Sequence, residues 1–217
     1  MLLPPADAAL FYRAWGALLA WVNEQRRVVA AFPRPAPGQP IDMALANQIR
    51  KVVWADDALR ERFLAEGASD LGDAERDLIA SWRHRISGQF IIFKHLQKHS
   101  IFMSKDVYAV LGIYTPFAEL FPFAPTYVHA VLIPFRDVII TDGILESPAM
   151  QISFGGGARR MFQQQYSSAR AAGQVCRSLP WQAVPDPGAP AGPKQASRMP
   201  SRSRARARTA RSRGPTR

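Results

Sequence analysis

Apolar residues recur with a period of about four over the first 87 residues, which predicts α-helices. The first helix starts near residue 5 and carries one wide apolar stripe, made of Leu10, Phe11, Ala14, Trp15, Leu18, Leu19 and Val22. It ends by Phe32, because the prolines at positions 33, 35, 37 and 40 cannot continue a helix. Three shorter helices are expected over residues 42–54, 56–67 and 73–87.

At Gly88 the apolar period changes from about four to about two, which predicts β-strands. The expected strands cover residues 90–96, 100–103, 107–114, 127–135 and 138–147. Arg136 and Asp137 form a tight hairpin turn between the last two, and the proline-rich, aromatic segment 115–126 is a packed connection. These short strands and tight turns indicate a small, antiparallel sheet of five to six strands, strongly bent or closed into a half-open barrel.

A final helix over 157–172 follows the strands and closes the domain. Its expected buried face consists of Met161, Phe162, Tyr166 and Ala169, and Gly173 ends it. Beyond Pro180 the composition falls to Ala, Pro, Gly, Ser and Arg, which cannot bury enough apolar surface to fold. We therefore predict one α+β domain over 1–180, with a helical part (1–87), a β part (88–154) and a closing helix (155–173), and a disordered basic tail over 181–217.

The net charge of +11 comes mostly from the tail. From Lys194 onward there are nine basic residues and no acidic ones, so the rest of the chain holds 28 − 9 = 19 basic residues against 17 acidic ones, a charge of +2. Such a tail binds polyanions through charge alone and carries no sequence preference. The predicted domain is close to neutral.

Cysteine usage and hydropathy bear on where the protein works. A single cysteine, Cys176, excludes an internal disulfide and any site with several cysteine ligands, and it fits a reducing compartment. The N-terminus lacks the basic segment and apolar run of a secretory signal, and no apolar stretch approaches the ~20 residues that span a bilayer. We expect a cytoplasmic protein that uses no membrane.

The glycine triplet Gly155, Gly156 and Gly157 is the strongest candidate for a binding site. A strand that runs through these glycines into a helix leaves free amide groups at the helix N-terminus, where an anion binds well. Arg159 and Arg160 in the first turn oppose the helix dipole unless an anion neutralises them. The spacing matches neither nucleotide motif, G-x-G-x-x-G or G-x-x-x-x-G-K-[ST]. The alternative is that the glycines only permit a sharp turn and close packing.

The remaining chemistry-bearing residues form no recognisable constellation. The histidines, His84, His95, His99 and His129, lack the partners of a zinc site, so we expect no metal and no cofactor. Asp137, Asp142 and Glu146 lie in or beside the last hairpin, where turn roles compete with acid–base or metal-binding roles. We assign no catalytic residue.

Several ordered blocks resemble a family of bacterial proteins that has no assigned function. They are FYRAW…LLAWVN, SWRHRISGQFIIFKHLQKHSIFM, VYAVLGIYTPFAELFP, YVHAVLIPFRDVIITDGIL and ISFGGGARRMFQQQY. The resemblance covers roughly residues 10–180 and implies no activity. The proteins that it resembles end near Leu179 and Pro180, so the arginine-rich tail is either an extension peculiar to this chain or a read-through.

Three functions follow from these residues. The first is a soluble, non-enzymatic binding or interaction module with a phosphate-type site at Gly155–157, Arg159 and Arg160. The second is a nucleic-acid-associated protein acting through the sheet, the two arginines and the tail. The third is a hydrolase or transferase that uses Asp142 or Glu146 in a cleft beside the glycine turn.

Overall fold

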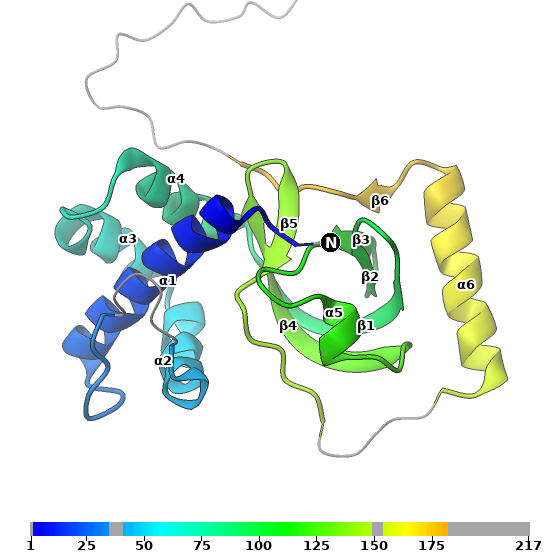
Figure 1. Cartoon of the computed structure of the whole chain (residues 1–217), viewed down its shortest axis with the longest axis horizontal. Helices are drawn as coiled ribbons and strands as arrows, with labels where there is room; N and C mark the ends of the chain where they lie inside the picture. Colours follow the sequence, from blue (N-terminus) through cyan, green and yellow to red (C-terminus); the bar gives the residue numbers. More distant parts are fainter. Residues whose placement is uncertain (1, 35–40, 149–153, 182–217) are drawn as a thin grey trace, which may run out of the picture. The chain divides into compact units, whose positions relative to one another are not determined.

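The structure is a computed structural model that describes residues 2–34, 41–148 and 154–181 (Figure 1). Residues Met1–Val184 group into one compact unit. The helical elements are α1 (Pro5–Arg26), α2 (Met43–Ala55), α3 (Asp57–Arg62), a π-helical turn (Phe63–Gly67), α4 (Asp73–Ser81), a 3₁₀ turn (Trp82–His84), α5 (Phe117–Leu120) and α6 (Gly156–Ala171). The strands are β1 (Ile86–His95), β2 (Ser100–Met103), β3 (Val107–Val110), β4 (Thr126–Phe135), β5 (Val138–Thr141) and β6 (Val175–Cys176).

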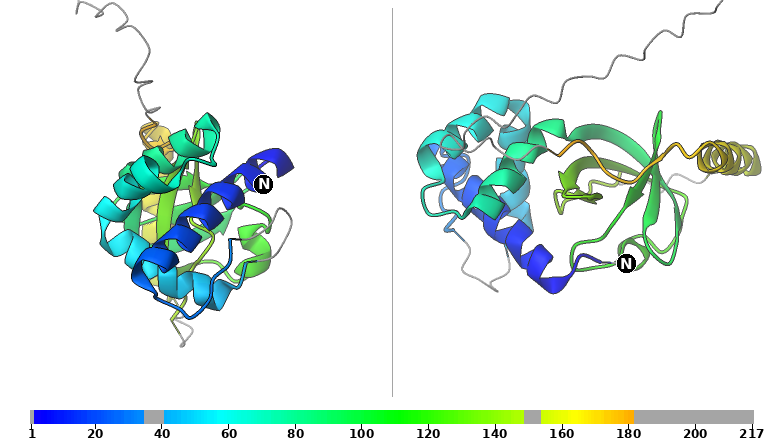
Figure 2. Two further views of the ribbon diagram at one scale, coloured as in Figure 1. Left: turned by 90° about the vertical axis from the view of Figure 1, so that its left-hand side faces the viewer. Right: turned by 90° about the horizontal axis from the view of Figure 1, so that it is seen from above.

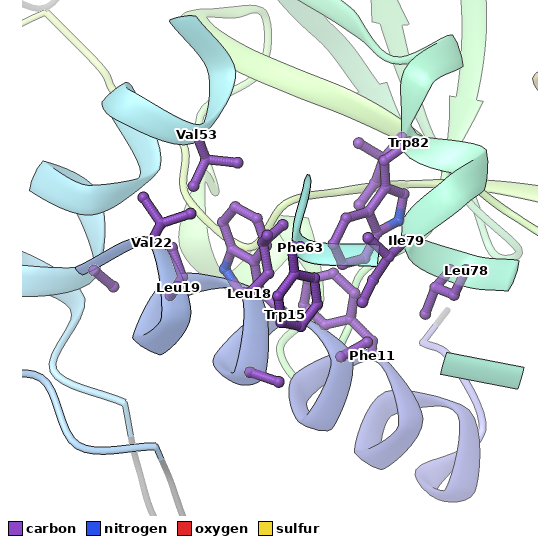
Figure 3. Packing of buried hydrophobic residues seen from close by; sticks show 14 of the residues in the cluster. Phe11, Trp15, Leu18, Leu19, Val22, Val53, Phe63, Leu78, Ile79 and Trp82 are labelled. Carbon is purple, nitrogen blue, oxygen red and sulfur yellow. The ribbon is translucent and has the colours of Figure 1, made fainter. Parts of the chain in front are cut away.

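Helix α1 packs along the centre of the helical part, and every residue of its predicted stripe is buried (Figure 3). Aromatic rings dominate this core: Trp15 stacks on Trp54 at a centroid distance of 5.3 Å and meets Trp82 edge-on at 5.5 Å. Gly67 is needed here, because a Cβ at that position would lie 2.5 Å from the Trp21 ring. The helix ends at Arg26, before the predicted limit of Phe32, and Arg27 caps it in the left-handed conformation.

Five strands close into a ring in the order β1–β2–β3–β5–β4, and β4 pairs again with β1 (Figure 1). All neighbours are antiparallel except β3 and β5, which pair in parallel at Val110 and Ile139. Strand β1 pairs with both β2 and β4, and its register with β2 shifts between Ile92 and Lys94. Along the chain, α5 lies between β3 and β4. This order of strands is that of the five-stranded OB-type barrel. Strand β6 adds in parallel to β3 at Val107 and Tyr108.

Alternation along the strands sorts their side chains between the inside and the outside of the barrel. The inside holds Phe90, Ile92, Phe102, Tyr108, Val110, Val128, Ala130, Leu132 and Ile139. Outward residues of β4 and β5, such as Val131 and Ile140, join the core of the helical part. Outward residues of β1, β2 and β3 pack instead against α6, which the right-hand view of Figure 2 shows end-on. The barrel therefore has two covered outer faces.

The α+β class, with N-terminal helices packed on a six-stranded sheet, is confirmed. The sheet is mixed and not purely antiparallel, because β5 and β6 both run parallel to β3. Three strand limits differ from the prediction by several residues: β1 starts at Ile86, β3 ends at Val110 and β5 ends at Thr141. Gly88 is part of β1, opposite Ala130 of β4, so it does not end a helix. The predicted disordered tail lies outside the described residues, apart from Trp181.

Candidate functional site

The glycine turn forms the start of α6 and faces open space. Gly155 is the N-cap residue, and no side chain of the described residues caps the first amides of the helix. A Cβ at Gly155, Gly156 or Gly157 would meet no atom of the described part of the chain within 4 Å. Close packing of the helix against the sheet therefore does not explain these glycines.

Both arginines of the first turn are exposed. The Arg159 Nε donates a hydrogen bond of 3.2 Å to the carbonyl oxygen of Phe154, which folds this side chain back over the glycine turn. The structure therefore holds one of the two predicted guanidinium groups beside the open amides. Arg160 lies on the exposed side of the same helical turn.

Helix α6 and the strand ends around it carry a wider group of cations, which we call the basic surface: Lys94, Lys98, Lys105, Arg159, Arg160, Arg170 and Arg177. Lys94 lies on β1, Lys98 in the β1–β2 turn and Lys105 in the β2–β3 turn. The α6 side chain of Gln165 donates hydrogen bonds to the carbonyl oxygens of Ser104 and Lys105, so the helix crosses the end of that turn.

Like charges crowd together on the basic surface. Burial lowers the pKa of the Lys94 ammonium, and the charge of Arg170 lowers this pKa further. Burial also lowers the pKa of His99, and the charges of Arg177 and Lys98 add to that shift. The repulsion that lowers the pKa of Lys94 and of His99 is one that a nearby anion would relieve.

Ion pairs are distributed unevenly over the chain. Within residues 2–34 and 41–85, cations pair with carboxylates repeatedly, as in Arg13–Glu75, Arg26–Asp56, Arg34–Asp70, Arg60–Asp57, Arg60–Glu61, Arg62–Glu66 and Arg85–Asp57. By contrast, no cation of the basic surface pairs with a carboxylate in the part of the chain that the structure describes.

Asp142, a candidate catalytic residue, lies at the centre of a buried polar network. Its Oδ2 accepts hydrogen bonds from the Nε of Arg50 and from the Trp54 Nε1 at 2.7 Å, and both donors come from α2. The Asp142 side chain is 0% exposed and that of Arg50 3% exposed. Burial raises the pKa of Asp142, while the charge and hydrogen bond of Arg50 oppose the rise. This carboxylate fastens α2 to the end of β5.

Glu146 continues the same network toward solvent. Its Oε1 accepts a hydrogen bond of 3.0 Å from the Asn47 side chain and lies 3.5 Å from the Lys51 ammonium. The Asn47 hydrogen bond is the main cause of its lowered pKa. The two carboxylates thus contact side chains of α2, and Asp142 also accepts a hydrogen bond from the Ile144 backbone. These contacts give both carboxylates a structural role.

His95 joins the barrel to the connection between β3 and β4. Its Nδ1 lies 2.8 Å from the Ser100 Oγ, and its Nε2 lies 2.9 Å from the Phe121 carbonyl oxygen. Because a carbonyl only accepts, Nε2 donates to Phe121 and Nδ1 accepts from the serine hydroxyl. The described residues contain no group of three or more His, Cys, Asp or Glu that could hold a metal ion.

Replacing His95 with phenylalanine is expected to lower the free energy of unfolding by about 1–3 kcal/mol, because Ser100 and the Phe121 carbonyl each lose a partner. A phenylalanine ring fills the half-buried position about as well as the imidazole does. The change in the free energy of unfolding therefore reports on the two hydrogen bonds. Urea denaturation measures the change, and His84→Phe is the control. A His95→Phe variant as stable as wild type would show that this bridge contributes nothing.

Comparison with protein-family models, with curated proteins and with solved structures found no match to this chain. The resemblance to a bacterial family therefore stays a prediction. Among the described residues, no helix is both long and apolar enough to cross a membrane.

Sequence reasoning missed most of the basic surface. Lys94, Lys98 and Arg177 are separated along the chain, and only the closure of the barrel and the return of the chain through β6 bring their neighbourhoods together. The available signal was the excess of basic over acidic residues between 154 and 181, where no acidic residue occurs.

Proposed function

We propose that this protein is a non-enzymatic binding module for a polyanion that carries repeated phosphate groups. The observation that carries the proposal is the basic surface, seven cations without a carboxylate partner among the described residues. Surface charges of opposite sign are normally interspersed, as they are on the helical part. A run of unpaired like charges is better explained by a ligand than by stability.

The glycine turn extends this surface and supplies a different kind of contact. Uncapped amides at the start of α6 donate hydrogen bonds with defined directions, whereas lysine and arginine side chains attract phosphate over a longer range. Arg159 lies at the junction of the two, since its side chain returns to Phe154. A chain of phosphates is the ligand that uses both.

A non-enzymatic role agrees with the state of the two carboxylates. A general acid or base must reach its substrate, but Asp142 is fully buried and bonded to Arg50 and Trp54. Glu146 is held by Asn47 and lies near Lys51. Removing either would disturb the attachment of α2 before it disturbed any chemistry.

Isothermal titration with inorganic polyphosphate tests the proposal on the full chain. We expect Arg159→Gln/Arg160→Gln to weaken binding by about tenfold, as the loss of one or two phosphate contacts does. The matched control is Arg26→Gln/Arg62→Gln, which removes the same charge from exposed arginines that are paired with Asp56 and Glu66. Equal affinity of the two double variants would show that Arg159 and Arg160 do not contact polyphosphate.

A further inference from the structure

Outward side chains of three strands form an apolar surface beneath α6. We call this surface the β1–β3 face; its residues are Ile91, Phe93, Ile101, Met103 and Val107. Their chain neighbours Phe90, Ile92 and Phe102 point into the barrel, which is complete without α6. The β1–β3 face is therefore not part of the barrel core, and its burial depends on the helix that covers it.

Helix α6 covers this face with few residues. Of its sixteen residues, all described, Tyr166 alone is buried, and Phe162 and Ala169 are half-buried against the strands. Met161, which was predicted to be buried, is 65% exposed, so that prediction is wrong. By comparison, twelve of the 22 residues of α1 are buried. Displacing α6 exposes far less apolar surface than displacing α1 would.

Aromatic rings and one lysine make the contacts between α6 and the strands, and the ring pairs are tilted or edge-on. The Phe93 ring lies 5.9 Å from the Tyr166 ring and 6.3 Å from the Phe162 ring, measured between centroids. The Lys94 ammonium lies 3.9 Å from the Tyr166 centroid and 5.1 Å from that of Phe93. A base stacked on Phe93 would take the place of the Tyr166 ring, and its phosphate would meet Lys94.

Charge complementarity decides the occupant. Lys94 and Lys105 border the β1–β3 face on β1 and at the β2–β3 turn, and Lys98 lies in the β1–β2 turn. An apolar platform with cations at its rim suits a strand whose bases are unpaired and whose phosphates are regularly spaced. The carboxylates of a protein partner are not regularly spaced as phosphates are. The bases of a duplex are paired and stacked on each other, so they are not free to stack on the β1–β3 face.

We propose that single-stranded nucleic acid binds the β1–β3 face and displaces α6. Its bases take the positions of Phe162 and Tyr166 against Phe93, and the basic surface holds its phosphates. Helix α6 is then an internal cover that competes with the ligand. This inference rests on the proposed function, because it names the polyanion and adds a base-binding platform to the phosphate contacts.

Fluorescence anisotropy on the full chain tests this inference with three probes: oligo(dT) of 20 nucleotides, a DNA duplex of 20 base pairs and inorganic polyphosphate. We expect oligo(dT) to bind more tightly than either other probe. Phe93→Ala should weaken oligo(dT) binding by about tenfold, the effect of losing one stacked base, and should leave polyphosphate binding unchanged. Phe162→Ala/Tyr166→Ala should bind oligo(dT) about fivefold more tightly, because the uncovered state becomes more populated. Met161→Ala/Gln164→Ala, on the exposed side of α6, is the control.

Hydrogen exchange of the wild-type chain gives a reading that does not depend on how the variants fold. Adding oligo(dT) should speed exchange in α6 and slow it in β1, β2 and β3. Slower exchange in α6, or equal affinity for duplex and single strand, would overturn the inference. If polyphosphate binds on the basic surface but oligo(dT) binds no more tightly, the base platform fails while the proposed function stands; if neither binds, both fail.

Discussion

Replacing Asp142 with alanine is expected to lower the free energy of unfolding by about 3–5 kcal/mol, because the buried Arg50 guanidinium then keeps only a longer ion pair, 3.6 Å from the partly exposed Glu146 carboxylate. The Arg50 side chain is 3% exposed, and its Nε donates to the Asp142 carboxylate. The variant also removes the acceptor of the Trp54 Nε1. Because Trp54 stacks on Trp15, the loss reaches the core of the helical part.

Guanidinium denaturation followed by circular dichroism measures this change. The matched control is Glu66→Ala, which breaks an exposed pair with Arg62 and should cost no more than about 0.5 kcal/mol. The double variant Arg50→Met/Asp142→Leu should regain much of the lost stability, since neither partner is then left charged in the interior. An Asp142→Ala variant within about 1 kcal/mol of wild type would show that Arg50 reaches solvent or another acceptor.

Neutralising four cations of the basic surface should weaken polyphosphate binding by about 100-fold near physiological salt, the product of four lost phosphate contacts. The variant is Lys94→Gln/Lys98→Gln/Arg170→Gln/Arg177→Gln. Each glutamine keeps part of the side-chain length and removes the charge. None of the four cations pairs with a carboxylate among the described residues, and Lys94 contacts the Tyr166 and Phe93 rings. The free energy of unfolding should therefore fall by no more than about 1 kcal/mol.

A control variant of equal charge separates position from net charge. Arg13→Gln/Arg26→Gln/Arg34→Gln/Arg62→Gln removes four exposed cations that are paired on the helical part. We expect it to bind polyphosphate within about threefold of wild type, because long-range attraction is screened at this salt concentration. Equal losses in both quadruple variants would mean that only total charge matters.

Elements with a clear period were predictable from sequence, because burial of one face imposes that period. The α1 stripe is buried as predicted, and the hairpin turn at Arg136 and Asp137 lies between β4 and β5. Gly173 follows α6 with a φ of 67°, as the predicted C-terminal glycine requires. These features depend on neighbours in the chain.

Ring closure and the buried ion pair were not predictable, because they join residues far apart in sequence. Strands β3 and β5 pair in parallel, so no hairpin turn joins them and no turn motif in the sequence indicates their pairing. Arg50 and Asp142 are separated by 92 positions, and each is an ordinary surface residue type until the fold brings both inside. The short α5 was hidden by the prolines around it.

Only the part of the candidate site that is local in sequence was predictable. The glycine turn and its arginines form one local motif, and the structure leaves that turn open to an anion. The lysines of β1 and of the two turns join the site only because α6 lies across the β1–β3 face. The sequence therefore predicted the candidate site at the start of α6, but it did not predict the rest of the basic surface.

We propose that cations around α6, and not the tail, hold a chain of phosphates. The dependence of polyphosphate affinity on salt tests this proposal when it is measured for the full chain and for the Lys94, Lys98, Arg170 and Arg177 quadruple variant. The logarithm of the association constant falls with the logarithm of salt by about 0.7 per neutralised phosphate on a single strand, so the variant's slope should be shallower by about 3. Identical slopes for the two chains would contradict the account.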